Sequence, residues 1–198
     1  AAPRPFDDVV RGATRQDGLL PLWRKDEKVW FEMAPERLDQ ALRLSVNISH
    51  SVGERGLSAS SMGPSWLVAF RKTGSAQVQL VALNTRFVAS GAPMKTAVEQ
   101  AFSNSLLGSA AIASAPHPQR KSVLVDASFL LSDLPGYSTA LERAYRLSYG
   151  LDRANSYFEK TRADADMTTL NARLHFATPR IPAPPLVPGA APAPSPPS

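Results

Sequence analysis

Apolar and polar residues alternate along several stretches of the chain, and this alternation predicts β-strands. Residues 42–49, LRLSVNIS, show it most clearly: the leucines, the valine and one isoleucine share a face, and polar side chains share the other. Residues 66–88 predict a β-hairpin around a turn at 73–75, and the alternation returns over 121–133 and 167–177. One buried and one solvated face is typical of antiparallel sheets.

A helical period of apolar residues is confined to short stretches. Residues 93–107 begin with a proline where a first helical turn tolerates it, and they repeat apolar side chains at helical spacing. Residues 137–150 place Thr139 three positions before Glu142, which predicts a capping box, and they end at a glycine expected to stop the helix. A third, shorter helix is expected over residues 6–13.

The segment PFDDVVRGATRQDGLLPLWRKDEKVWFEM, residues 5–33, combines dense charge with alternating apolar side chains. Its charged run at Lys25–Glu27 lies where a hairpin must turn. The alternation puts Trp23 and Trp30 on the face opposite the aliphatic residues, so both faces of the hairpin carry apolar side chains. We therefore expect another element to cover the hairpin. The sequence leaves open whether that element lies outside this chain.

These patterns predict an α+β protein, mainly antiparallel β-sheet with a few short packed helices and an extended proline-rich C-terminal tail. Residues 1–40 are expected to form an N-terminal helix and hairpin module. Residues 41–178 are expected to form a β-rich module packed with it, including a Gly/Ser-rich loop over 51–65 that is mobile or functional. Residues 179–198 hold half of the 18 prolines, which predicts a polyproline-like linker to missing downstream domains.

Composition narrows the class of protein. A chain of 198 residues with 43% hydrophobic content can bury a core, and it contains no cysteine, which excludes disulfides and thiolate ligands. The net charge is +5, but the sequence contains no nucleic-acid-reading motif, so we expect no nucleic-acid partner. No apolar run is long enough for a membrane span. The chain begins with Ala1 and no signal core: a signal has been removed or the chain was trimmed. We favour export, to the periplasm or beyond.

Motifs for catalysis or metal binding are absent from the sequence. His50, His117 and His175 lie too far apart for an H-E-x-x-H helix, although three separated histidines can still converge in space. Neither a G-x-S-x-G nucleophile elbow nor a phosphate-binding glycine loop occurs. We therefore assign no catalytic residue, no metal ligand and no cofactor to this chain.

Five residues are candidates for an interaction surface. Aromatic side chains can serve as binding anchors, although a core role is the more common one. Adjacent aspartates near a helix start are usually cap or solvated residues. The candidates are Trp23, Trp30, Trp66, Asp7 and Asp8.

Residues 5–38 resemble the short N-terminal module, of unknown function, of large exported bacterial zinc metallopeptidases of the Met-zincin type. The run from Trp23 to Glu32, WRKDEKVWFE, is similar to the family core LYRKDDKVYLE, with aromatic-for-aromatic changes. Residues 42–161 resemble the module that follows. The family's zinc motif, H-E-x-x-H-x-x-G-x-x-H, is not in this sequence, so the resemblance implies zinc only in a missing catalytic domain.

The resemblance implies a non-catalytic accessory region that packs on, positions or holds latent the downstream metallopeptidase domain of the same polypeptide. An aspartate of the N-terminal helix would be the candidate ligand in a latent form. The alternative is an independent peptide- or glycan-binding module of the cell envelope. The sequence leaves open the substrate of the peptidase, removal on maturation and the number of copies that assemble.

Overall fold

Most of the chain is described by a computed structural model, which covers residues 3–85, 91, 93–94, 97 and 103–179. Within them β-strands prevail and helices are short, which confirms the expected α+β, mainly antiparallel fold. The expected proline-rich tail lies outside the described residues from residue 180 onward, as does the middle of the helix expected over 93–107.

The chain divides into two compact units. The first unit consists of Ala1–Ser45, Ser65–Leu131 and Tyr157–Ala172. The second consists of Val46–Pro64, Ser132–Ser156 and Arg173–Ser198. Residues 1–40 thus belong to one unit together with a large part of the module expected to follow them.

An antiparallel sheet in the first unit is ordered β1-β2-β3-β8. Its strands are β1 (Thr14–Gln16), β2 (Leu22–Lys25), β3 (Lys28–Met33) and β8 (Val123–Asp126). The pairing of Lys25 with Lys28 leaves Asp26 and Glu27 as a two-residue turn, which confirms the expected hairpin. Trp23 lies opposite Trp30, so the two tryptophans share a face of the sheet as expected.

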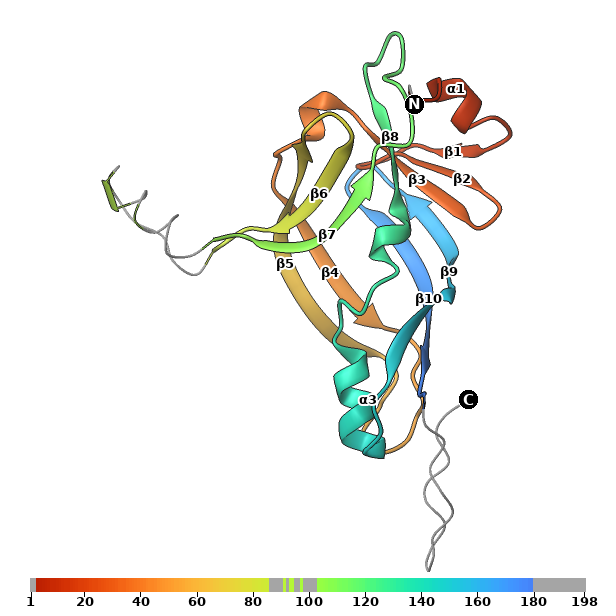
Figure 1. The fold of residues 1–198 in the computed structure, drawn as a ribbon, viewed down its shortest axis with the longest axis vertical. Helices are drawn as coiled ribbons and strands as arrows, with labels where there is room; N and C mark the ends of the chain where they lie inside the picture. Colours follow the sequence, from red (N-terminus) through yellow and green to blue (C-terminus); the bar gives the residue numbers. More distant parts are fainter. Residues whose placement is uncertain (1–2, 86–90, 92, 95–96, 98–102, 180–198) are drawn as a thin grey trace, which may run out of the picture. The chain divides into compact units, whose positions relative to one another are not determined.

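Helix α1 (Phe6–Val9) covers the tryptophan face of this sheet, so the covering element belongs to the chain itself. Figure 1 shows the helix beside the strands of the hairpin. Phe6 and Val10, 2% and 6% exposed, form a core cluster with Trp30 and Leu124. A helix of four residues is too short to be stable alone, so it depends on these contacts.

A second sheet is ordered β4-β5-β6-β7. Its strands are β4 (Leu42–Ile48), β5 (Ser61–Thr73), β6 (Gln77–Ala82) and β7 (Ser105–Ala111). The strand expected over 42–49 is confirmed, and so is the hairpin, although its turn lies at 74–76, one residue later than expected. Two expectations were too broad. The predicted loop at 51–65 becomes strand β5 from Ser61 onward, and the end of the helix predicted over 93–107 is strand β7.

The strand expected over residues 121–133 is shorter than its alternation suggests. Strand β8 ends at Asp126, and a 3₁₀ helix, η2 (Ala127–Leu130), follows it. The carboxylate of Asp126 accepts a hydrogen bond from the backbone N–H of Ser128 at 2.8 Å, which starts the turn. Such a side-chain cap competes with the ladder of a strand. A second 3₁₀ helix, η1 (Pro35–Arg37), follows β3.

The described part of the second unit contains helix α3 (Tyr137–Tyr145). The helix was predicted, but its caps were not: Asp133 accepts from the backbone N–H groups of Tyr137 and Ser138, and neither Thr139 nor Glu142 forms the predicted capping box. The helix ends at Tyr145, before the expected glycine, and Arg146 after it is in the left-handed region with φ 58°.

The remaining strands, β9 (Gly150–Ala163) and β10 (Thr168–Ala177), form a two-stranded sheet. Strand β10 confirms the strand expected over 167–177. Strand β9 was not predicted. The second unit has its own core cluster, made by one leucine of the 51–57 loop, one leucine of α3 and two tyrosines: Leu57, Leu141, Tyr145 and Tyr149.

Candidate functional site

A buried carboxylate, Glu32, lies at the centre of the motif that carries the resemblance. It is in strand β3 and is 3% exposed. Because side chains alternate along a strand, Glu32 shares a face with Trp30, and Trp23 is opposite Trp30 on the neighbouring strand. The sheet therefore puts the carboxylate diagonally across from the Trp23 indole, next to Leu124, its partner in β8.

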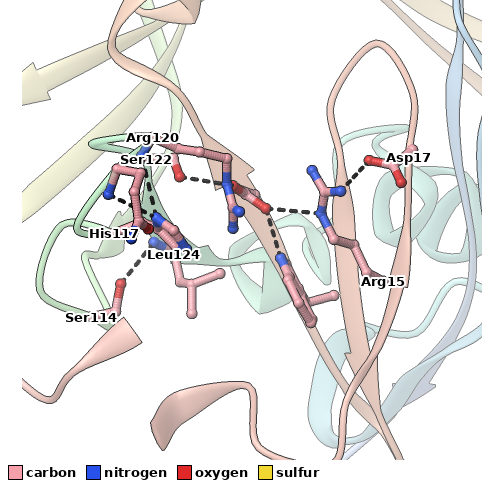
Figure 2. Close-up of polar contacts among 10 residues, drawn as sticks. Arg15, Asp17, Ser114, His117, Arg120, Ser122 and Leu124 are labelled. Atoms are coloured by element: carbon pink, nitrogen blue, oxygen red, sulfur yellow. Dashed lines mark hydrogen bonds and ion pairs between the residues drawn. The ribbon is translucent and has the colours of Figure 1, made fainter. Parts of the chain in front are cut away.

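Four side chains donate hydrogen bonds to Glu32, two to each oxygen. Oε1 accepts from Arg120 Nε at 2.6 Å and from Ser122 Oγ at 2.7 Å. Oε2 accepts from Trp23 Nε1 at 2.9 Å and from Arg15 Nε at 3.1 Å. Figure 2 shows Arg120 and Ser122 on one side of this cluster and Arg15, paired with Asp17 at 2.5 Å, on the other. We call these five residues, Arg15, Trp23, Glu32, Arg120 and Ser122, the Glu32 network.

The network keeps Glu32 ionised. Burial by itself would raise the pKa of this carboxyl group, but the hydrogen bonds from Trp23, Ser122 and Arg120 outweigh burial. With the charge of Arg120 they lower the pKa from 4.5 to about 2. A carboxylate that is ionised and accepts four hydrogen bonds cannot serve as a general base or bind a ligand without losing some of them. Its role here is to fix the side chains around it.

The pH dependence of stability should reveal this carboxylate. A pKa lower in the folded protein than in the unfolded chain stabilises the fold above about pH 4.5, and this contribution is lost as the pH falls towards 2. The shift corresponds to about 3 kcal/mol. We expect the free energy of unfolding, from urea titrations between pH 6 and 2.5, to fall more steeply in the wild-type protein than in Glu32→Gln. Parallel curves would contradict this.

The predicted interaction residues fall in different places. Trp30 is 6% exposed, and Trp23 is half-buried with its indole N–H bound to Glu32. Asp7 is exposed in the first turn of α1, and Asp8 forms an ion pair with Arg11. The fold thus gathers these four around helix α1. The fifth, Trp66, is half-buried in strand β5, away from that core cluster.

The three histidines are not brought to one site. In the described part of the chain, no three His, Cys, Asp or Glu side chains are grouped in a way that could hold a metal ion. His117 Nδ1 accepts from the backbone N–H groups of Gln119 and Arg120, 3.2 Å each. His175 Nδ1 is 3.2 Å from a carboxylate oxygen of Asp152.

The glycine-rich loop at residues 51–57 is anchored to helix α3. Ser51 Oγ and the Tyr137 hydroxyl are 2.6 Å apart, and the Tyr145 hydroxyl donates to Glu54. The Arg55 guanidinium lies over the Tyr145 ring, 5.1 Å from its centroid. Burial, then the Glu54 carboxylate, raises the pKa of Tyr145 to about 12. The loop that was expected to be mobile or functional is therefore held by side-chain contacts.

Within the Glu32 network, Trp23 is the one residue that the sequence offered as a candidate for an interaction surface. Glu32 had a signal: it is the acidic residue between Phe31 and Met33 in a strand expected to bury both faces. A charge in that position requires partners. The partners Arg120 and Ser122 are 88 and 90 residues away in sequence, and no pattern connects them to Glu32.

Comparison of the chain with protein-family models, with curated proteins and with solved structures gives no match. Among the residues that the structure describes, no helix has both the length and the apolar character needed to cross a membrane.

Proposed function

We propose that this chain is a non-catalytic accessory region of an exported, zinc-dependent metallopeptidase, and that it packs on or positions the catalytic domain of the same polypeptide. The observation that carries the proposal is that, in the motif that resembles that family, the side chains make contacts within the fold. Trp23 and Glu32 bind each other, and Trp30 is buried under helix α1. Because these three side chains are bound to each other or buried, they support a preformed scaffold rather than a reacting site. Zinc, in this proposal, belongs to the catalytic domain.

An apolar surface on the second sheet supports packing against another domain. The backbone N–H of Leu83 donates to Leu67, and Val81 pairs with both Ala69 and Leu106. Cross-strand partners share a face, so these side chains lie on one surface of the sheet. Leu67 is 40% exposed and Leu106 is 57% exposed. The two leucines lie on either side of β6, and Val81 between them is 7% exposed. Exposed leucines that flank a buried apolar residue on one face support a surface that a partner covers.

Peptidase activity of the parent polypeptide, with and without residues 1–198, tests the proposal. If the region positions the catalytic domain, its removal should lower peptide cleavage at saturating zinc, and adding the purified region back should restore part of it. A rise in activity on removal would identify an inhibitory form of the same accessory role. No change in either direction would overturn the proposal and favour an independent peptide- or glycan-binding module.

The apolar surface provides a matched pair of variants for the same assay. Leu106→Asp should weaken restoration by the added region about tenfold or more, because a charge in a buried contact is costly. Met62→Asp is the control, since Met62 is also apolar, is 86% exposed and lies in the other unit. Equal effects of the two variants would exclude this surface as the contact.

A further inference from the structure

The ring of Phe6 occupies a socket made by three side chains. The Trp23 ring meets it edge-on with centroids 6.1 Å apart, and the His117 ring does so at 5.0 Å. The Arg120 guanidinium lies over the Phe6 ring, 5.6 Å from its centroid. An aromatic anchor held by rings and a cation is the arrangement found at the centres of protein interfaces. We call Trp23, His117 and Arg120 the Phe6 socket.

The socket is held in place by groups other than Phe6. Glu32 binds both the Trp23 indole N–H and the Arg120 guanidinium. His117 is fixed by the hydrogen bonds that its Nδ1 accepts from Gln119 and Arg120. Because these contacts do not involve helix α1, the socket is already formed when Phe6 arrives. A preformed pocket binds its anchor without the cost of ordering its own side chains.

The segment that fills the socket is joined to the sheet by a glycine hinge. In the part of the chain that the structure describes, two hydrogen bonds attach its backbone to the rest of the unit: Ala115 N donates to Arg4 O at 2.7 Å, and Lys25 Nζ donates to Arg11 O at 2.9 Å. Gly12 has φ +77°, just before strand β1 begins at Thr14. A left-handed residue turns the chain back onto the sheet, whereas an extended residue there would carry the segment away.

We propose that the Phe6 socket is an exchangeable binding site, and that its occupant in trans is segment 3–13 of a second copy of this chain. The second copy is the fitting occupant because the contacts of the socket are made by this sequence, with Phe6 and Val10 as anchors one helical turn apart. Each copy then lacks its anchor until the other supplies it, as in domain swapping through a hinge. The proposal stands independently of the proposed peptidase role.

A hinge substitution in the full chain tests the exchange. Gly12→Val has room for its side chain, since an added Cβ would meet only the Lys25 side chain at 3.8 Å, but the left-handed φ of the closed turn disfavours it. We expect a dimer fraction about tenfold or more above that of the wild-type protein, measured by light scattering after size exclusion. Gly74→Val is the matched control: its φ is +62° with nothing within 4 Å, but it lies in the β5–β6 turn.

Three outcomes would overturn the proposal: a monomeric Gly12→Val, equal dimerisation of Gly74→Val, or dimers that persist when Phe6→Ala is added to Gly12→Val.

A second measurement does not depend on a hinge variant. The chain has no cysteine, so Val9→Cys and Ala113→Cys can be made in separate copies and mixed. Both positions pack against the core cluster under α1. Exchange predicts cross-linking by a short thiol reagent, well above that of Val9→Cys with Met167→Cys, an exposed position. Equal yields would contradict it.

Discussion

Replacing Glu32 by alanine should lower the free energy of unfolding by about 3–5 kcal/mol, because removing one partner of a buried ion pair leaves the others uncompensated. In this protein the donors left without their acceptor are two guanidinium groups, the indole N–H of Trp23 and the hydroxyl of Ser122. Arg15 and Arg120 are partly exposed, so water can reach them, but the Ser122 side chain is buried and the Trp23 indole is half-buried. Urea unfolding followed by tryptophan fluorescence measures the change.

Two variants separate the charge of Glu32 from its shape. Glu32→Gln keeps the side-chain volume but turns an NH₂ group towards donors, so we expect a loss of similar sign and smaller size. Glu27→Ala removes an exposed carboxylate from the turn of the same hairpin and should change stability by less than about 0.5 kcal/mol. A cost below about 1 kcal/mol for Glu32→Ala would show that the network does not hold the sheet together.

The features that follow from local alternation could be predicted from the sequence. The turn at Asp26 and Glu27 and the shared face of Trp23 and Trp30 follow from the period of a strand and a short charged run. Strand β4 follows from four apolar residues at every second position. In these segments the residues that decide the structure are neighbours in sequence, so one pattern contains all the information.

Features that depend on distant or single side chains could not be read in the same way. The alternation over 121–133 continues past Asp126, but the carboxylate of that residue binds the backbone ahead and ends the strand. Thr139 and Glu142 have the spacing of a capping box, yet Asp133 reaches the first helical N–H groups instead. Glu32 illustrates the same limit, because a buried charge signals that partners exist but not which ones.

Replacing Phe6 by alanine should lower the free energy of unfolding by about 3–5 kcal/mol, the usual cost of removing a buried aromatic side chain. The side chain is 2% exposed and contributes ring contacts to Trp23 and His117 as well as the Arg120 contact. Helix α1 has only four residues and depends on this anchor. The largest possible loss is therefore that of all contacts between the helix and the sheet, which is reached if the helix detaches. Asp7→Ala is the control: Asp7 is an exposed residue of the same helical turn, so its replacement should have a small effect.

The site of the damage distinguishes this variant from Glu32→Ala. The Trp23 indole N–H is bound to Glu32 and not to Phe6. In Phe6→Ala we therefore expect this N–H to stay protected from hydrogen exchange while the backbone N–H of Ala115, which donates to Arg4, loses protection. In Glu32→Ala the indole N–H should lose protection as well. Joint loss of both signals in Phe6→Ala would show that the socket is formed by its occupant and is not preformed.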